Sequence, residues 1–191
     1  LIGANGAGKS TLLKLLLGIF RPEQGSLSLD CEDRRFALNR STRSLFAYVP
    51  QGNLLLSGTL RENLTITKPD ASQEEITRAV YVSAMEEYLV QLPKGLDTVL
   101  GENSAGLSEG QAQRLAIARA VLGGAKILLL DECTSALDQE TEKMVLQRLK
   151  SLQDRTCIAV THRPAAVELC DCQLQVSNGL ILQSNGHDSL L

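Results

Sequence analysis

The chain has 191 residues, of which 43% are hydrophobic and 21% are charged, and its formal net charge is −3 at pH 7. These proportions are those of an ordinary globular protein, and the small negative charge argues against a broad electrostatic attraction to nucleic acid. Aromatic residues make up only 3% of the chain, too few for the stacking platforms that bind bases. We therefore expect no nucleic-acid partner.

The chain opens on a predicted phosphate-binding loop. Residues 3–10 read Gly-Ala-Asn-Gly-Ala-Gly-Lys-Ser and fit the pattern G-x-x-x-x-G-K-[ST]. Glycines let successive backbone N–H groups turn inward around phosphate oxygens, Lys9 can reach the outer phosphates, and the Ser10 hydroxyl can bind Mg²⁺. A helix predicted over residues 10–17 would add the positive end of its dipole. The alternative is a glycine-rich turn before an ordinary helix, and the later motifs weigh against it.

Only Leu1 and Ile2 precede this loop. A phosphate loop normally follows a buried strand, and two residues are too few to form one. We therefore expect the rest of that strand, and further parts of the domain, to lie upstream of Leu1.

Two strands are predicted next, at residues 25–30 and 44–49, the second of them followed by Pro50 and Gln51. The pattern then changes. Within residues 74–92 the apolar positions recur at a spacing that suits helices, and residues 70–72 supply candidates for an N-cap. The stretch from 52 to about 107 is therefore interpreted as a helical insertion within an α/β domain.

The second half of the chain alternates helices with buried strands. Ser108 and Asp138 are each expected to cap a helix. Two unbroken apolar runs predict strands that are buried on both faces, at residues 127–130 and 157–160. A hairpin is predicted last, from two strand-like segments on either side of Ser-Asn-Gly, at residues 172–176 and 180–183.

Several polar residues share one structural position, directly after a predicted strand: the phosphate loop, Gln51, the pair Asp131-Glu132, and His162. A parallel sheet brings such strand ends to one edge. Asp131 can hold Mg²⁺ there, directly or through water, and Glu132 can accept a proton from an attacking water. The alternative for an Asp-Glu pair after a strand is helix capping, which is disfavoured because a phosphate loop requires such an acid.

These motifs, in this order, resemble those of the nucleotide-binding domain of an ABC transporter. Residues 107–111, Leu-Ser-Glu-Gly-Gln, resemble the signature segment of that family, and residues 127–132, Ile-Leu-Leu-Leu-Asp-Glu, resemble its Walker B strand. Residues 135–138, Ser-Ala-Leu-Asp, resemble its D-loop, Gln51 its Q-loop, and residues 161–163, Thr-His-Arg, its switch histidine. The resemblance covers nearly the whole chain.

The resemblance implies an α/β fold of the P-loop NTPase (RecA-like) kind, with a mostly parallel sheet and an inserted α-helical subdomain. The core would comprise about residues 1–51 and 108–191, and the subdomain about residues 52–107. The whole chain would then be one nucleotide-binding domain that lacks its first strands.

The same resemblance implies ATP and Mg²⁺ as cofactors and ATP hydrolysis as the reaction. Glu132 would be the general base, His162 would hold the γ-phosphate and the water, and Gln51 would sense the water. The metal ligands would be Ser10, Gln51 and Asp131. The nucleotide would be bound by Gly3, Ala4, Asn5, Gly6, Ala7, Gly8, Lys9, Ser10, Thr11, Gln51 and His162.

A further group of residues would bind the ATP of a second nucleotide-binding domain across a head-to-tail dimer: Ser108, Gly110 and Gln111. A serine at a helix N-terminus has a physical basis for this role, because it offers a hydroxyl, free N–H groups and a dipole to an anion. The alternative is that Ser108 only caps its own helix, and the sequence leaves both interpretations open.

Three segments resemble exporter-type members of the family: residues 56–64 after the Q-loop, residues 101–102 at the X-loop, and residues 186–191 at the C-terminal ending. The resemblance implies that ATP binding and hydrolysis power substrate export across a membrane. The partner would be a transmembrane domain on the same polypeptide, and the location would be the cytoplasmic face of the cell membrane.

Two residues near these motifs depart from expectation. Glu109 stands where the family usually has glycine, and we expect its side chain to point outward. Cys133 follows Glu132 and is expected to be a small buried residue rather than a regulatory thiol. Two other functions stay open: a soluble ABC protein of translation or DNA repair, which predicts paired nucleotide domains and basic patches, and a fragment that only binds or is inert.

Overall fold

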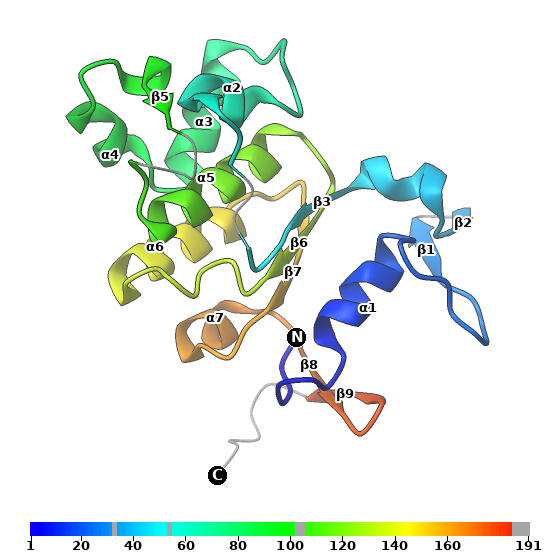
Figure 1. Cartoon of the computed structure of the whole chain (residues 1–191). Helices are drawn as coiled ribbons and strands as arrows, with labels where there is room; N and C mark the ends of the chain where they lie inside the picture. The colour runs from blue at the N-terminus through cyan, green and yellow to red at the C-terminus, as the bar shows by residue number, and fades with distance from the viewer. Residues whose placement is uncertain (32–33, 53–54, 102–105, 185–191) are drawn as a thin grey trace.

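The computed structural model describes residues 1–31, 34–52, 55–101 and 106–184. Its helices are α1 (Lys9–Leu16), α2 (Leu60–Thr65), α3 (Gln73–Val82), α4 (Glu86–Gln91), α5 (Glu109–Leu122), α6 (Gln139–Lys150) and α7 (Pro164–Leu169), with the 3-10 helices η1 (Arg40–Leu45) and η2 (Gly95–Asp97). Its strands are β1 (Ser28–Cys31), β2 (Arg34–Ala37), β3 (Phe46–Val49), β4 (Gly58–Thr59), β5 (Val99–Leu100), β6 (Ile127–Asp131), β7 (Thr156–Val160), β8 (Gln173–Ser177) and β9 (Leu180–Ser184). Figure 1 shows α1 on one side of a central sheet, α5 and α6 on the other, and α2, α3 and α4 grouped at one end.

The central sheet has three parallel strands in the order β3–β6–β7. The middle strand, β6, pairs with a neighbour on both sides, so that Leu128 lies opposite Ala47 of β3 and Cys157 of β7. Its apolar run suits this place because a central parallel strand is covered on both faces, and Leu128, Leu129 and Leu130 are all buried. The strand predicted over 127–130 is thereby confirmed.

The start of the chain continues the sheet on the far side of β7. The backbone N–H of Thr161 donates to the carbonyl of Leu1 at 3.3 Å, next to the end of β7. On the other side, Ile2 donates to Leu174 at 2.9 Å, and Val176 donates back to Ile2 at 2.8 Å. Residues 1–2 therefore occupy a strand position between β7 and β8, directly before the phosphate loop.

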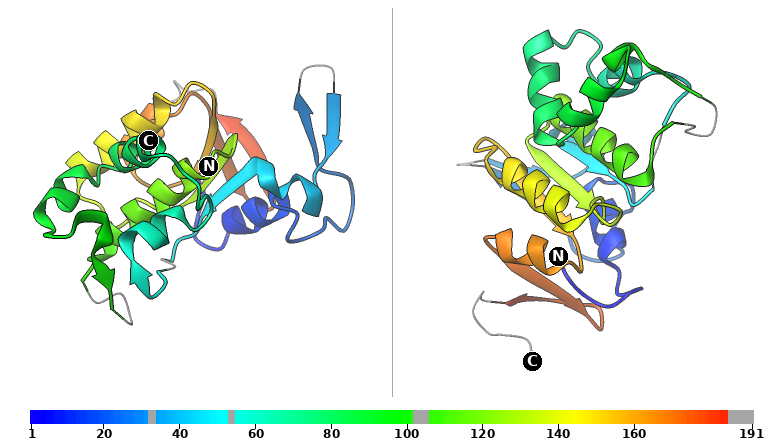
Figure 2. Two further views of the ribbon diagram at one scale, coloured as in Figure 1. Left: turned by 90° about the horizontal axis from the view of Figure 1, so that it is seen from above. Right: turned by 90° about the vertical axis from the view of Figure 1, so that its left-hand side faces the viewer.

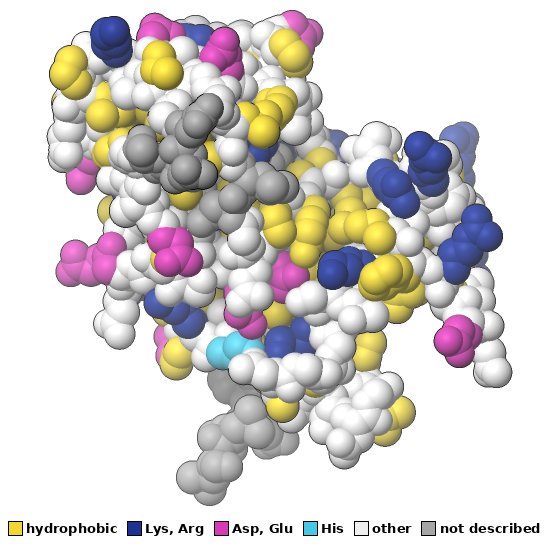
Figure 3. Space-filling view, in the orientation of Figure 1, with side chains coloured by type: hydrophobic (Ala, Val, Ile, Leu, Met, Phe, Trp, Pro, Cys, Tyr) yellow, Lys and Arg dark blue, Asp and Glu magenta, His cyan; other side chains and the backbone are white. Residues whose placement is uncertain are grey.

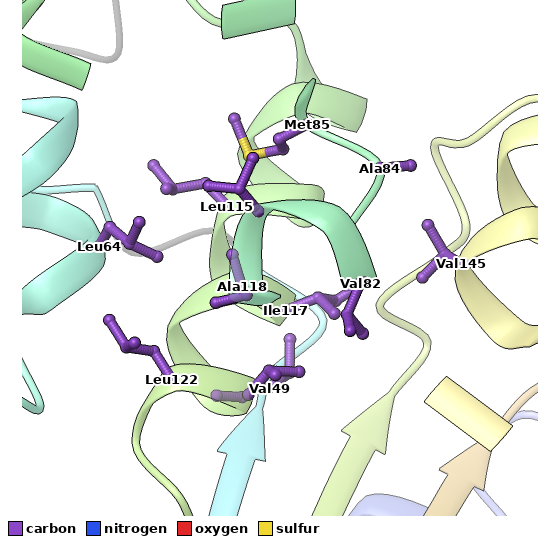
Figure 4. Packing of buried hydrophobic residues seen from close by; sticks show 14 of the residues in the cluster. Val49, Leu64, Val82, Ala84, Met85, Leu115, Ile117, Ala118, Leu122 and Val145 are labelled. Atoms are coloured by element: carbon purple, nitrogen blue, oxygen red, sulfur yellow. The ribbon is translucent and has the colours of Figure 1, made fainter. Parts of the chain in front are cut away.

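The sheet separates two hydrophobic clusters. On the face covered by α1 (the α1 face), Leu13 and Leu17 pack with Leu129 and Val160. On the opposite face (the α5 face), Leu128 belongs to a much larger cluster built with α2, α3, α5 and α6, part of which is drawn in Figure 4. Successive residues of a strand point to opposite faces, so the single strand β6 supplies both clusters.

The helices α2, α3 and α4 form a group that we call the helical group. Two of them begin with a capping box, in which Thr59 pairs with Glu62 and Ser72 pairs with Glu75. The N-cap expected within residues 70–72 is thus Ser72. The helices expected within residues 74–92 are confirmed as two, α3 and α4, because Ala84 between them adopts a left-handed φ of 56° that no helix can continue through.

Arginine side chains of α5 and α6 form polar contacts with the helical group. Arg114 donates to the carbonyl of Ala84 at 2.7 Å, close to the break between α3 and α4. Arg148 of α6 pairs with Glu86 at 2.6 Å and lies 3.8 Å from the centre of the Tyr81 ring. These contacts join the helical group to α5 and α6, in addition to the hydrophobic cluster that the same helices share.

Short elements are where the structure departs from the sequence-based expectations. The strand expected from residue 44 begins at Phe46, because residues 40–45 form η1, capped by Asn39. The strand expected from residue 25 begins at Ser28 and pairs with β2 in a hairpin that projects from the molecule (Figure 2). The elements β2, α2 and α7 were not predicted: β2 is exposed along its whole length and has no alternation of burial, and six residues are too few to show the 3.6-residue period of a helix. Within the described part of the chain, no helix combines the length and apolar character needed to span a membrane.

Candidate active site

A cleft of about 410 Å³ opens where the strands β3 and β6 end beside α1. Its lining residues are Asn5, Gly6, Gly8, Lys9, Ser10, Thr11, Gln51 and Glu132. The cleft thus brings the predicted phosphate loop together with two of the polar residues predicted at strand ends. In Figure 3, the histidine side chain and acidic side chains lie side by side near the middle of the visible face.

Close packing against the sheet sets the shape of the phosphate loop. Gly3 has a φ of 151°, and a Cβ there would lie 2.4 Å from the carbonyl oxygen of Val176, so only glycine fits. The buried Lys9 ammonium donates to the carbonyl oxygens of Gly3 at 2.7 Å and of Ala4 at 2.9 Å. A lysine ammonium has three donors, so Lys9 braces the loop with two of them and keeps a third for an anion.

The helix α1 begins without a side-chain cap. Its N-cap is Gly8, at φ 99°, which has no side chain to bond the first N–H groups. The helices α2, α3, α5 and α6 each begin at a side chain that accepts such a bond, whereas α4 and α7, like α1, have no side-chain cap. The first turn of α1 is the one that lines the cleft, and it leaves its N–H groups and its positive dipole end to a ligand.

Asp131, at the end of β6, is buried, and both of its carboxylate oxygens accept hydrogen bonds. The Ser10 hydroxyl donates to Oδ1 at 3.1 Å. The Tyr48 phenol, on the neighbouring strand β3, donates to Oδ2 at 2.9 Å. Burial, and then the bond to Asp131, raise the pKa of Tyr48 to about 12, so that the phenol keeps its proton at neutral pH.

Glu132 lies between the ends of β3 and β7. The side-chain amide of Gln51 donates to its Oε2 at 3.0 Å, and Nε2 of His162 lies 3.5 Å from its Oε1. The backbone of Glu132 has a φ of 50°, a left-handed conformation that costs a non-glycine residue on the order of 1–3 kcal/mol. The structure therefore brings together three residues that the sequence placed only by their strand ends.

The loop at residues 134–138 is held from two sides, by the buried Gln113 and by the partly exposed Arg163. From α5, the Gln113 amide donates to the Ser135 hydroxyl and accepts from the backbone of Ala136, both at 3.0 Å. From the segment after β7, Arg163 donates at 2.8 Å to the carbonyls of Ser135 and Leu137. The loop is thereby tied to the residue that follows His162.

Arg163 also pairs with a buried carboxylate. Its guanidinium lies 2.9 Å from Oε2 of Glu142 in α6, and the Thr134 hydroxyl donates to Oε1 at 2.7 Å. Glu142 is 1% exposed. A buried charge needs partners of this kind, and the sequence carried no local signal for this pairing.

The three residues expected to bind the ATP of a second domain do not line the cleft. Ser108 and Gln111 form the capping box of α5, which confirms the predicted cap. At Gly110 a Cβ would lie 2.9 Å from the carbonyl oxygen of Ala136, so this glycine allows α5 to approach the 134–138 loop. Glu109 is exposed, as expected.

Cys133 is buried, as expected from the sequence. Burial raises the pKa of its thiol to about 12, so it holds its proton and is not a nucleophile at neutral pH. Two other expectations, for Glu102 in the X-loop and for residues 186–191 in the C-terminal ending, lie outside the described residues.

Comparison with known proteins assigns the family. The family described as ABC transporter matches residues 1–135. The cyclolysin secretion/processing ATP-binding protein of Bordetella pertussis is 37% identical over 191 residues, and the leukotoxin translocation ATP-binding protein of Mannheimia glucosida is 38% identical over 192. A bacterial Atm1-family ABC exporter solved with ATP bound superposes with a TM-score of 0.84 at 34% identity, over 93% of this chain and 32% of that one.

The chain therefore belongs to the ABC transporter family. The predicted α/β fold of the P-loop NTPase kind, with its parallel sheet, is confirmed. Each alignment with a toxin-secretion relative includes 100% of this chain but only 27% of the relative. The chain therefore spans about a quarter of the length of these relatives.

Proposed function

We propose that this chain binds and hydrolyses ATP as the nucleotide-binding domain of an ABC exporter, at the cytoplasmic face of a membrane. The observation that carries the proposal is the cleft in which the phosphate loop meets Glu132. The names of the toxin-secretion relatives and of the ATP-bound exporter support it. The core would comprise about residues 1–51 and 108–191, and the helical subdomain about residues 52–107.

The phosphate loop would bind the triphosphate. The uncapped first turn of α1 presents N–H groups and the positive end of its dipole. Lys9 adds a charge that is already braced by two backbone carbonyls. Because these groups are held in place before the ligand arrives, little conformational entropy is lost on binding.

Glu132 is the proposed general base. It would take a proton from the water that attacks the γ-phosphorus, a role suited to a carboxylate within reach of the bound phosphate. The Gln51 amide and His162, which contact its two oxygens, would orient it, and His162 would also hold the γ-phosphate. The left-handed backbone of Glu132 is the strain that such placement costs.

The oxygen ligands that Mg²⁺ prefers meet beside the phosphate loop, where Ser10 Oγ and Asp131 Oδ1 are 3.1 Å apart. Ser10, Asp131 and the side-chain oxygen of Gln51 are the proposed ligands. When bound there, the ion would neutralise charge on the phosphate oxygens as the bond breaks.

Ser108, Gly110 and Gln111 are proposed to contact the ATP of a second domain in a head-to-tail dimer. They lie at the N-terminus of α5, outside the cleft of their own chain. A transmembrane domain is the other proposed partner, since the curated relatives are more than three times as long as this chain.

The proposed function is tested by Glu132→Gln in the full-length protein. Loss of the base should lower ATP hydrolysis by at least about 100-fold and leave ATP affinity unchanged, measured by turnover and by equilibrium binding. Glu140→Gln, an exposed residue on α6, is the matched control and should hydrolyse normally. If the Glu132→Gln variant hydrolyses ATP at the normal rate, Glu132 is not the general base.

A second variant tests binding itself. Lys9→Ala combined with Ser10→Ala should abolish measurable ATP binding, because it removes the phosphate-binding charge and a metal ligand together. ATP affinity that survives this double change would overturn the proposed function.

A further inference from the structure

The buried carboxylate of Asp131 accepts hydrogen bonds from two hydroxyls, one of which, the phenol of Tyr48, lies outside the predicted site. Tyr48 donates to Oδ2 at 2.9 Å, while Ser10 donates to Oδ1 at 3.1 Å. The two bonds reach Asp131 from different elements, β3 and α1. The two oxygens of the carboxylate therefore have different partners. Oδ2 accepts from the neighbouring strand β3, and Oδ1 lies next to the phosphate loop.

The fold holds Tyr48 firmly in this position. It pairs in register with Leu129, two residues before Asp131, and its ring packs against the buried cluster of the α1 face. Alternation along β3 places Ala47 and Val49 against the cluster on the opposite face. The ring of Tyr48 is thus packed against the cluster, which leaves the side chain little freedom to rotate away from Asp131.

The carboxylate itself depends on these donors. Asp131 is 3% exposed, and a polar group that far from water needs hydrogen-bond partners. If the Tyr48 bond were missing, Oδ2 would lose its donor and the carboxylate could rotate about its last bond. The oxygen beside Ser10 would then be held toward the phosphate loop by the Ser10 bond alone.

We propose that Tyr48 is a positioning residue for the cation of the bound nucleotide: it binds Oδ2 of Asp131 and so keeps Oδ1, beside Ser10, available for Mg²⁺. This inference rests on the proposed function, because it requires that Asp131 and Ser10 hold the metal. It adds that the affinity for the metal–nucleotide complex is set in part by a residue that touches neither metal nor nucleotide. Partners that orient metal ligands in this way commonly change affinity or activity by about 10- to 100-fold.

The test is Tyr48→Phe, which keeps the packed ring and removes only the donor. In the full-length protein we expect affinity for ATP with Mg²⁺ to fall about tenfold and affinity for ATP in EDTA to stay unchanged, both measured by equilibrium binding. The Mg²⁺ concentration that gives half-maximal turnover should rise by a similar factor. Tyr88→Phe removes a phenol that bonds the carbonyl of Gly106 at 3.2 Å and is the matched control, expected to behave as wild type.

A double variant separates positioning from general damage. In an Asp131→Asn background, Tyr48→Phe should add no further loss in affinity for ATP with Mg²⁺, because the group it positions is gone. Full additivity, equal losses with and without Mg²⁺, or a Tyr48→Phe protein indistinguishable from the Tyr88→Phe control would each overturn the inference. If instead the wild-type protein binds no ATP, the proposed function itself fails, whatever Tyr48 does.

Discussion

The two faces of the β3–β6–β7 sheet carry hydrophobic clusters of very different size. Among the described residues, the buried hydrophobic cluster on the α1 face has four members, whereas the cluster on the α5 face, which α5, the helical group and α6 share, has 23. The α1 face nevertheless carries the phosphate loop. The part of the fold proposed to hold the nucleotide is therefore the part with the least hydrophobic support.

This difference has a physical consequence for binding. A thinly packed region opens at lower free energy than a deep core, and a ligand that binds only the closed form stabilises it by mass action. The proposed nucleotide would then supply to the α1 face some of the stability that the α5 face obtains from packing. On the same face, Lys9, Ser10 and Tyr48 add hydrogen bonds to the apolar contacts.

Neighbouring leucines of β6 give the largest expected effect and the most direct test of the comparison. Leu128 and Leu129 are both 0% exposed, and they face opposite clusters. Leu128→Ala should lower the free energy of unfolding by about 4 kcal/mol, because the deep cluster cannot collapse into the cavity, and Leu129→Ala by only about 2–3 kcal/mol. Urea denaturation measures both. A larger cost at Leu129 would mean that the α1 face is the more rigid one.

The second prediction concerns the polar bonds between the loops at the site. Arg163→Met leaves Glu142 buried without its cation, which should lower the free energy of unfolding by about 3 kcal/mol. Adding Glu142→Leu should restore most of that loss, because it removes the stranded charge. If the double variant is no more stable than Arg163→Met, the cost comes from the backbone bonds of Arg163 to the 134–138 loop.

Two serines with the same local role separate stability from function. Ser72 and Ser108 each close a capping box, on α3 and α5 respectively. Replacing either by alanine should lower the free energy of unfolding by about 1 kcal/mol. Only Ser108→Ala should also lower ATP turnover, because only Ser108 is proposed to bind the ATP of a second domain. Equal ATP turnover in the two variants would mean that Ser108 only caps its helix and does not bind the ATP of a second domain.

The smallest expected effect is a pH dependence of the helical group. The Lys68 ammonium and the Ser72 backbone N–H hold the pKa of the Glu75 carboxyl below its ordinary value, and Thr59 does the same for Glu62. A carboxyl whose pKa is lower in the folded state stabilises the fold above its unfolded pKa, about 4.3, and loses that contribution as the pH falls through the folded value. The free energy of unfolding should therefore decline as the pH falls below about 4.3, and less steeply in Glu75→Gln.

Most of the long elements were predictable because their signals are local. The phosphate loop, the capped starts of α3, α5 and α6, and the apolar strands β6 and β7 can each be recognised in fewer than twenty consecutive residues. The break at Ala84 and the short helices α2 and α7 were missed, although α2 opens with the capping-box pair Thr59 and Glu62 and α7 opens with Pro164; six residues were too few for the apolar spacing to support those signals.

The sequence alone pointed to the residues that are proposed to carry the chemistry, because each of them lies within a short motif or directly after a predicted strand. Only the tertiary structure decided how those residues are held. The bonds of Tyr48 to Asp131 and of Gln51 to Glu132 join residues more than 80 positions apart, and the pair of Arg163 with Glu142 joins two separate elements. Such pairings depend on the order of strands in the sheet and on which face each residue meets, and neither is encoded in any short stretch of the chain.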